Sequence, residues 1–352
     1  MSPADTLVPD RLARDIAGAV SRLSAEWPRL AGAKLLMTGG TGFIGRWLLE
    51  MLRAADLEQG LGLEVMVLSR DPDAFVRKAP HLADHSGFRL VPGDVRGFEA
   101  GQGDFTHVIH AAADASAALN EADPLAMFDT AVEGTRQVLQ LARKCRVTRV
   151  LMLSSGAVYG AQPWDMTHVA EDWTGGPDLS SHRSAYAEGK RAAEMLGTIY
   201  RQQHGMDVGI ARIFTVLGPL LPLDTHFAAG NFLRDAMAGK AVTVNGDGRA
   251  VRSYLYAADL AEWLWAMLLR APVNATYNLG SEQGVSIGEL AERTARLIGN
   301  GSHEILGQAD AGWNPGRYVP STAKIRRELG VSETVDLDKA LRRTAAWNGW
   351  YA

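Results

Sequence analysis

The sequence predicts an α/β protein built on a Rossmann-like, doubly wound parallel sheet, with a smaller mixed α/β domain on its C-terminal side. Two observations carry this prediction. Short apolar runs without alternation, such as KLLMTG and RVLMLSS, take turns with longer amphipathic stretches, as strands buried on both faces of a sheet do. A glycine-rich turn follows the first apolar run and opens the first amphipathic stretch, as the first βα turn of such a sheet does.

The elements follow this pattern in order along the chain. Residues 10–26 carry apolar side chains at helical spacing and predict an N-terminal helical extension over residues 1–33. The strands of the sheet are expected at KLLMTG, LEVMVLSR, FRLVPGD, HVIHAAA, RVLMLSS and VGIARIF. The helices that cover it are expected from Phe43 to about Ala55, from about Phe128 to Lys144, and from Ser184 to about His204.

After Gly218 the regular alternation of strands and helices gives way to shorter and more varied elements. GPLLPLDTHFAAGN is loop-rich, AVTVNGDGRAVRSYLY predicts two strands around a glycine-rich turn, and DLAEWLWAMLL predicts a helix. We therefore expect a Rossmann domain over residues 34–216, with residues 250–268 returning to it. Residues 217–249 and 269–352 would form the smaller, substrate-binding domain.

Composition limits the classes of function. The chain has 352 residues, 47% of them hydrophobic, and a net charge of −4, so nothing indicates binding to nucleic acid or to an anionic membrane. Cys145 is the single cysteine, which excludes an intrachain disulfide and favours a reducing compartment. No apolar run approaches the roughly 20 residues that span a bilayer. We expect a soluble cytoplasmic protein with no membrane partner and no metal site.

The glycine-rich turn indicates a dinucleotide site. In MTGGTGFIG, Gly39 allows the tight turn, Gly42 lets the backbone approach a pyrophosphate, and Gly45 permits close helix–strand packing. The helix that follows offers unpaired N–H groups and the positive end of its dipole to phosphates. A glycine-rich turn can also be only a turn. We expect the cofactor to contact the intervening residues as well, namely Thr41, Phe43 and Ile44.

The end of the second strand bears on which dinucleotide is bound. An acidic residue there would bind the ribose hydroxyls of NAD, but this chain has Ser69 and Arg70. Arg70 could pair with a 2′-phosphate, which favours NADP over NAD. In the alternative, Arg70 is solvated and Asp71 reaches the ribose. After the third strand, Asp94 and Val95 are expected beside the adenine, with Asp94 accepting from its exocyclic amine.

A Tyr–Lys pair suggests the catalytic centre. Tyr186 and Lys190 are four residues apart and so lie on one face of a helix. A lysine ammonium favours the phenolate and lowers the pKa of the phenol, which suits Tyr186 to exchange a proton with a substrate oxygen. Ser155, at the end of the preceding strand, could hydrogen-bond the same oxygen. The alternative is that Tyr186 packs in the core and Lys190 is solvated.

The ordered motifs TGGTGFIG, GDV, HAAA, SSGAVYG, Tyr186-x-x-x-Lys190 and RSYLYAADLA resemble those of the extended short-chain dehydrogenase/reductase superfamily. Within it, they are similar to the NAD(P)-dependent nucleotide-sugar epimerase/dehydratase family. The resemblance extends from about Lys34 to Glu282. It implies a nucleotide-diphosphate sugar as substrate, Ser155 as the catalytic hydroxyl, Tyr186 as the acid/base and Lys190 as its partner.

The resemblance also implies further contacts. Arg252 matches an arginine that contacts the substrate diphosphate, although an ion pair with Asp259 is the alternative. Asn231 lies in the family's nucleotide-binding segment, and Thr215 stands where an asparagine often holds the diphosphate. Gly156 directly follows the catalytic serine and is expected beside the substrate. The remaining positions expected to line the cofactor are at strand ends, namely His110, Ala111, Ala112, Ala113 and Ser154.

Departures from the family pattern narrow the reaction. The 4,6-dehydratases carry Asp-Glu directly after the catalytic residue, where this chain has Gly156 and Ala157, and neither can act as acid or base. The decarboxylating branch keeps the Glu, so Ala157 argues against that reaction too. Ala131 replaces a common asparagine. What remains is 4-keto reduction or 4-epimerisation, with reduction slightly favoured by the NADP preference. The competing class is a non-catalytic dinucleotide sensor or scaffold.

The sequence gives less information on the oligomeric state and on the loops that determine substrate specificity. In the family, the helix over residues 128–144 and the helix that contains Tyr186 form a four-helix interface, so a homodimer is expected. Specificity is expected in the loops, over residues 161–183, 217–231 and 308–320. Their tryptophans could stack on a sugar or base, or could only anchor the loops; they are Trp164, Trp173 and Trp313.

Overall fold

The structure is a computed structural model that describes residues 4–98, 103–112, 117–224, 227–309 and 314–351. Ala113 and Trp313, both singled out above, lie outside the described residues. Within these ranges, no helix is both long enough and apolar enough to cross a membrane.

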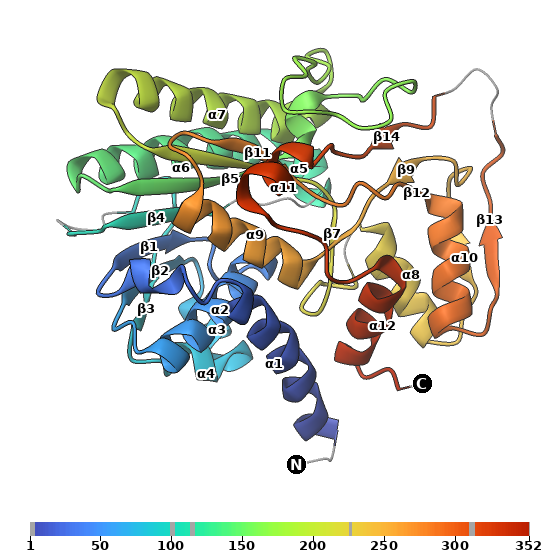
Figure 1. Cartoon of the computed structure of the whole chain (residues 1–352). Helices are drawn as coiled ribbons and strands as arrows, with labels where there is room; N and C mark the ends of the chain where they lie inside the picture. Colours follow the sequence, from blue (N-terminus) through green and yellow to red (C-terminus); the bar gives the residue numbers. More distant parts are fainter. Residues whose placement is uncertain (1–3, 99–102, 113–116, 225–226, 310–313, 352) are drawn as a thin grey trace.

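A seven-stranded parallel sheet forms the centre of the larger lobe, in the order β11-β6-β5-β4-β1-β2-β3 (Figure 1). This confirms the predicted doubly wound sheet. The strand order reverses between β1 and β4, where open α/β sheets bind their ligands at the carboxyl ends. The strands are β1 Lys34–Thr38, β2 Glu64–Ser69, β3 Phe88–Pro92, β4 His107–His110, β5 Arg149–Ser155, β6 Val208–Ile213 and β11 Thr276–Leu279.

Helices cover both faces of this sheet because successive strand residues point to opposite sides and are apolar on both. Leu35 and Met37 of β1 pack into one hydrophobic cluster, and Leu36 between them packs into the other. The first face carries α2 Phe43–Gln59, α3 Pro72–Lys78, α4 Pro80–Ala83 and α9 Ala257–Arg270. The second carries α6 Pro124–Lys144 and α7 Ala185–His204, with the short α5 Ala117–Ala122 beside α6.

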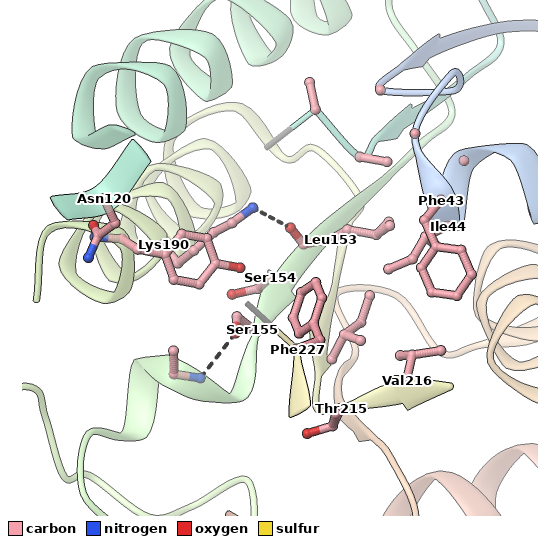
Figure 2. A pocket seen from close by; sticks show the side chains of 18 of the residues that line it. Phe43, Ile44, Asn120, Leu153, Ser154, Ser155, Lys190, Thr215, Val216 and Phe227 are labelled. Atoms are coloured by element: carbon pink, nitrogen blue, oxygen red, sulfur yellow. Dashed lines mark hydrogen bonds between the residues drawn. The ribbon is translucent and has the colours of Figure 1, made fainter. Parts of the chain in front are cut away.

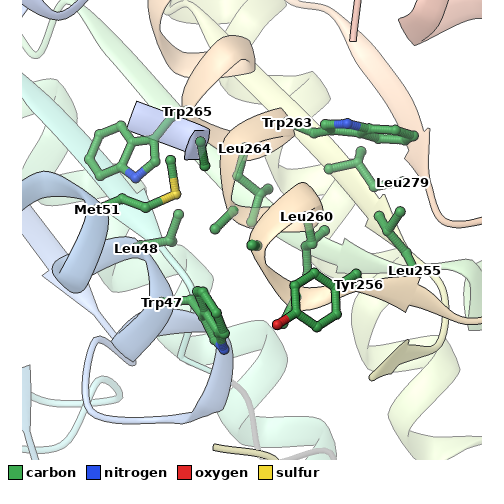
Figure 3. Close-up of a cluster of buried hydrophobic side chains, with 14 of the residues drawn as sticks. Trp47, Leu48, Met51, Leu255, Tyr256, Leu260, Trp263, Leu264, Trp265 and Leu279 are labelled. Carbon is green, nitrogen blue, oxygen red and sulfur yellow. The ribbon is translucent and has the colours of Figure 1, made fainter. Parts of the chain in front are cut away.

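Aromatic side chains fill the space between α2 and α9. Trp47 of α2 meets Tyr256 edge to face, with ring centroids 6.2 Å apart, and Trp263 and Trp265 of α9 are fully buried nearby (Figure 3). Residues Ala257 to Leu269 of α9 are all buried. Because α9 is buried along its length, its acidic residues Asp259 and Glu262 included, it is a core element of the larger lobe. Of the segment 250–268 that was expected to return to this lobe, Val251–Arg252 instead forms strand β9 of the smaller lobe.

The smaller lobe consists of short strands and helices near the carboxyl ends of the large sheet. One three-stranded sheet has the order β12-β9-β14, and a second pairs β13 with β8. Its strands are β8 Val242–Val244, β9 Val251–Arg252, β12 Val285–Ser286, β13 His303–Ile305 and β14 Arg317–Tyr318. Its helices are α8 Ala228–Met237, α10 Ile287–Ile298 and α12 Leu337–Trp347. Between the lobes, β7 Val216–Leu217 pairs with β10 Leu255–Tyr256.

One predicted boundary needs correction. Residues from 269 onward were assigned to the smaller domain, but β11 joins the large sheet as its edge strand by pairing in parallel with β6. Helix α11, Ala323–Leu329, which comes later in the chain, packs on β11. The larger lobe therefore takes two further segments from the C-terminal part of the chain.

The N-terminal extension packs against both lobes. Helix α1 spans Ala4–Arg22, earlier than the expected 10–26, and a short 3-10 turn follows at Trp27–Leu30. The helix contacts α2 and α9 of the larger lobe and α12 of the smaller one. Asp15 accepts hydrogen bonds from the Tyr256 hydroxyl and from Arg343 of α12. The extension thus connects the two lobes.

Candidate active site

A cavity of about 1100 Å³ lies between the two lobes at the carboxyl ends of the large sheet (Figure 2). The structure brings most of the predicted residues together in its lining. Those from the larger lobe and its loops are Gly39, Thr41, Gly42, Phe43, Ile44, Gly45, Ser69, Arg70, Asp94, Val95, Ala111, Ala112, Ser154, Ser155, Tyr186, Lys190 and Thr215. Arg252 reaches the cavity from the smaller lobe.

The glycine turn has room for a phosphate only at its middle glycine. Gly39 has φ +71°, and a Cβ there would lie 2.5 Å from the Ala111 carbonyl carbon. A Cβ on Gly45 would lie 2.2 Å from the Gly39 oxygen. A Cβ on Gly42 would meet only that oxygen, at 3.4 Å. Gly42 also precedes α2 without a side-chain cap, so the first N–H groups of α2 are left for a ligand. This cradle fits the pyrophosphate of a dinucleotide.

The end of β2 offers an arginine, while its neighbouring carboxylate is engaged elsewhere. Arg70 is exposed and lines the cavity. The Asp71 carboxylate accepts from the Ala74 amide at 2.9 Å and caps α3, which weakens the alternative that it binds a ribose.

Asp94 lines the cavity and receives two hydrogen bonds from the Arg96 guanidinium, at 2.9 and 3.0 Å. These lower the pKa of Asp94 to about 2, so it is an ionised acceptor at neutral pH.

Ser155, Tyr186 and Lys190 lie together at the end of β5 and the start of α7, as predicted. The predicted lowering of the Tyr186 pKa by Lys190 is wrong: burial raises the pKa of Tyr186, and only a hydrogen bond with the Ser155 side chain partly offsets that rise. The Lys190 ammonium donates to the Leu153 carbonyl at 2.8 Å (Figure 2). Asn120 of α5, which sequence reasoning missed, accepts from the Tyr186 backbone amide at 3.1 Å. The alternative of a solvated Lys190 is wrong, because its side chain is buried.

Burial lowers the pKa of Lys190 to about 8, although Glu194 one turn away opposes the shift. The unfolded chain, with an ordinary lysine pKa near 10.4, binds more protons than the folded one between these values. The contribution of Lys190 to the free energy of unfolding therefore rises as the pH increases from about 8 to about 10. Below pH 8 the ammonium is charged in both states, and its burial costs stability.

Replacing Lys190 with methionine removes this cost. We expect the free energy of unfolding of Lys190→Met to exceed that of the wild type at pH 7 by up to about 3 kcal/mol, and the difference to shrink towards pH 10. Urea unfolding of the ligand-free protein at several pH values measures it. Lys339→Met serves as the control, because Lys339 is exposed on α12. A stability difference that does not change with pH would contradict the assignment.

Three predicted contacts are placed differently by the structure. His110 is buried and its ring nitrogens lie 2.8 Å from the Thr38 hydroxyl and 3.0 Å from the Thr135 hydroxyl; burial lowers its pKa to about 3. Asn231 accepts from Arg234. Neither side chain is part of the cavity lining among the described residues. Ser154 does line it, but its hydroxyl donates to Glu194 at 2.6 Å.

Arg252 is available to an anion in the cavity. Its guanidinium donates to the Val251 carbonyl at 2.9 Å. The alternative partner, Asp259, instead accepts from the hydroxyl and amide of Thr334, at 2.6 and 2.9 Å. The predicted alternative of an Arg252–Asp259 ion pair is therefore wrong, and Arg252 keeps its proposed place beside a substrate diphosphate.

Gly156, which was expected beside the substrate, is not part of the cavity lining among the described residues, and it has no room for a side chain. A Cβ there would lie 2.6 Å from the Phe214 ring and 2.7 Å from the Tyr318 hydroxyl. Sequence reasoning missed both aromatic residues, which line the cavity. The one signal for Tyr318 was its place in the segment 308–320, which was expected to hold specificity determinants. The position after Ser155 is glycine because an aromatic pair, Phe214 and Tyr318, occupies the space beside it.

Trp164 and Trp173 contact neighbouring side chains outside the cavity. The Arg317 guanidinium lies 4.9 Å from the centroid of the Trp164 ring, and Trp173 packs on the buried cluster that contains Tyr159 and Phe214. Neither belongs to the cavity lining in the described part of the chain. The structure thus supports the anchoring alternative for these two side chains.

Comparisons with known proteins show the family to which the chain belongs. The profile of the NAD dependent epimerase/dehydratase family matches residues 35–280. The chain is 31% identical over 311 residues to UDP-glucuronic acid decarboxylase 1 of Xenopus tropicalis, covering 88% of this chain and 71% of that protein. It also resembles the solved structure of Thermus thermophilus UDP-glucose 4-epimerase in complex with NAD, with 26% identity and a TM-score of 0.74 over 90% of this chain and 99% of that one.

The fold is shared still more widely. Thermotoga maritima UDP-glucose 4-epimerase, solved with UDP-glucose, has a TM-score of 0.77 at 20% identity, over 90% of this chain and 98% of that one. The predicted resemblance is confirmed by the family match and by these relatives. The chain belongs to the NAD dependent epimerase/dehydratase family and is an enzyme of the extended short-chain dehydrogenase/reductase type.

Proposed function

We propose that the protein catalyses NAD(P)-dependent reduction of a 4-ketosugar, or 4-epimerisation, on a nucleotide-activated sugar. The observation that carries this proposal is the combination of Tyr186 and Lys190 with no carboxylate directly after Ser155. Gly156 and Ala157 hold those positions, and the aromatic side chains of Phe214 and Tyr318 leave no space for a side chain at the first.

The residues of the site have distinct tasks in such a reaction. The turn at Gly42 and the start of α2 would hold the pyrophosphate of the cofactor, and Arg252 the diphosphate of the sugar nucleotide. When bound, the nicotinamide exchanges a hydride with the sugar carbon. Tyr186 gives its phenolic proton to the sugar oxygen in reduction and takes it back in oxidation. Ser155 hydrogen-bonds the same oxygen, and Lys190, one turn along α7 from Tyr186, would hydrogen-bond the nicotinamide ribose.

A second candidate is decarboxylation of a nucleotide-linked uronic acid. It is favoured by the sequence relatives, which include UDP-glucuronic acid decarboxylases at 31% identity. Against it stands Ala157, since the resemblance places a glutamate there in the decarboxylating branch. We prefer reduction or epimerisation, because Gly156 and Ala157, which follow Ser155, supply no carboxylate.

Substrate assays on the purified protein separate these candidates. We expect a nucleotide 4-ketosugar to be reduced with loss of cofactor absorbance, or UDP-glucose and UDP-galactose to interconvert. Mass spectrometry of the protein as purified adds a second readout: retained NAD favours epimerisation, and an empty site that binds NADPH favours reduction. Release of carbon dioxide from UDP-glucuronic acid, without either of the first two activities, would replace the proposal by decarboxylation.

We propose NADP as the preferred cofactor, because Ser69 and Arg70 follow β2 and Asp71 is engaged in capping α3. Replacing Arg70 with glutamate should weaken NADPH binding about 10–100-fold, the effect of losing a charge-assisted hydrogen bond, and leave NADH affinity within a few-fold. Fluorescence titration with both cofactors measures this. Arg89→Glu, on β3, is the control. Equal losses for the two cofactors would contradict the assignment.

We propose a homodimer through α6 and α7, which pack side by side. Large apolar side chains are exposed on these helices, notably Met195 and Ile199 on α7 and Leu125 on α6. Light scattering should give twice the chain mass of 37.9 kDa, and Met195→Glu should shift the protein towards the monomer. A monomer mass for the wild type would refute this assembly.

A further inference from the structure

We propose that the protein binds an oligophosphate anion at a second site, in a cavity at the amino ends of the large sheet. This cavity has a volume of about 780 Å³, which is within the range of ligand sites. It is lined by the first residues of β4 and β5, His107 and Arg149, and by the carboxyl-terminal ends of α6, α7 and α9. Its described lining shares no residue with that of the cavity that contains Tyr186, so the site does not depend on the proposed function.

Positive charge collects in the lining of this second cavity. Five arginines and a single carboxylate, that of Asp207, belong to it among the described residues, although the whole chain has a net charge of −4. Guanidinium groups bind phosphate oxygens through paired N–H donors. A local excess of guanidinium groups in a net negative protein therefore favours a phosphate-bearing anion. The arginines are Arg29, Arg143, Arg146, Arg149 and Arg270.

Two of these arginines neutralise groups that would repel an anion. The Arg149 guanidinium lies 2.6 Å from the Asp207 carboxylate. It also donates to two carbonyls in the last turn of α9, at 3.2 and 3.3 Å, and Arg29 donates to a third carbonyl of that turn at 2.6 Å. Unpaired carbonyls make a helix C-terminus negative, and these contacts remove much of that effect for α9.

Other donors in the lining have no partner. Arg143 and Arg146 are exposed, and their guanidinium groups make no hydrogen bond or ion pair with any residue that the structure describes. They lie at the end of α6 and in the turn that follows it. The Nε of Arg270 is buried and has no hydrogen-bond partner in the described part of the chain, and a buried donor without a partner costs free energy. A phosphate-bearing ligand would supply acceptors to such donors.

The backbone of Arg146 supports a role for its side chain. Its φ of +54° lies in the left-handed region. The Arg146 amide donates to the Arg143 carbonyl at 3.1 Å, and the Val147 amide donates to the Ala142 carbonyl at 2.9 Å; these are the two hydrogen bonds of a Schellman motif. Glycine is favoured at this position because a Cβ strains the conformation. An arginine held there indicates that its guanidinium group has a use.

The positions of these groups indicate the class of anion. Arg143 and Arg146 can each hold one phosphate group, so an anion with several phosphates can meet both. The apolar side chains of Val147, Met206 and Val273 also line the cavity and offer contacts to the base of a nucleotide. An inorganic oligophosphate and a nucleoside triphosphate share the phosphate chemistry. Affinity for UTP well above that for inorganic tripolyphosphate would identify a nucleotide as the ligand, and equal affinities would identify the phosphate chain alone.

Calorimetry with inorganic tripolyphosphate at low ionic strength tests the site. The double variant Arg143→Gln/Arg146→Gln should bind the probe at least about 10-fold more weakly at this site than the wild type does, the effect of losing charge-assisted hydrogen bonds. Its NADPH affinity should be unchanged, because the other cavity is intact. The matched control is Arg296→Gln/Arg342→Gln, which removes two exposed charges from α10 and α12. Tripolyphosphate binding by the first double variant equal to that of the wild type would overturn the proposal.

Replacing Arg146 with glycine separates a ligand-binding role from a structural one. Arg146→Gly relieves the strain of the left-handed backbone, so it should raise Tm of the ligand-free protein by about 2 °C. The same change removes a guanidinium group and should lower tripolyphosphate affinity about 10-fold. Opposite signs for the two effects support a side chain retained for binding. A higher Tm with unchanged tripolyphosphate affinity would show that Arg146 holds no anion and would contradict the proposal.

Discussion

Tyr186→Phe should lower kcat by about 10²–10⁴-fold, the range that positioned acid–base groups contribute, and leave cofactor affinity near that of the wild type. The ring stays in place at the start of α7, so only the proton on its oxygen is lost. In the structure the phenol hydrogen-bonds Ser155, and the Lys190 ammonium lies one helical turn away. These neighbours can orient a sugar oxygen, but they cannot replace its proton donor.

Single-turnover kinetics on the substrate found for the wild type measure this loss without a contribution from product release. The control is Tyr200→Phe, on the same helix, where the ring packs against His204 with centroids 5.1 Å apart. It should behave as the wild type. If turnover in Tyr186→Phe were unchanged, Tyr186 would not be the acid/base.

Gly45→Ala should remove both cofactor binding and much of the stability of the protein. The new Cβ would lie 2.2 Å from the Gly39 carbonyl oxygen and 2.5 Å from the Gly40 Cα. Both are backbone atoms that cannot rotate away, so the turn and the start of α2 must separate. We expect the free energy of unfolding to fall by roughly 3 kcal/mol, at the upper end of overpacking effects.

Gly42→Ala is the matched comparison, since it adds the same methyl group three residues earlier. Its Cβ would be 3.4 Å from the Gly39 oxygen, and its φ of −80° suits alanine. Tm should stay near that of the wild type, while cofactor affinity falls about 100-fold, or about 2.7 kcal/mol, because the methyl group occupies the approach of the pyrophosphate. Retained cofactor affinity in Gly42→Ala would contradict the placement of the phosphates.

The parts of the fold that local patterns determine could be predicted. The strands of the large sheet are apolar on both faces, and the glycine turn directly follows the first of them. The local sequence therefore indicates both the strands and the turn. Strand β11 was missed because its burial depends on pairing with β6, and its four residues carry no periodic signal. A strand this short at the edge of a sheet cannot be recognised from its own residues, because pairing with its neighbour determines its structure.

The same reasoning applies to the site. Tyr186 and Lys190 share one helix, and their spacing of four residues was enough to predict that they act together. Tyr318 meets Ser155 across 163 residues of chain, a contact that only the pairing of β9 with β14 creates. The alternative partner considered for Arg252 was Asp259, seven residues away, but Thr334 from a distant loop donates to the Asp259 carboxylate instead. Long-range partners of this kind cannot be inferred from spacing.

The helix α1 has a consequence for how the chain folds during synthesis. Its anchoring partners follow Asp15 by 241 and 328 residues, at Tyr256 and Arg343. The ribosome therefore releases α1 long before these two partners, although α2, which α1 also contacts, follows it closely. Until α9 and α12 are in place, the apolar side chains Ile16 and Val20, buried in the finished protein, are only partly covered. The contact between Asp15 and Arg343 forms only after α12 has been synthesised and folded.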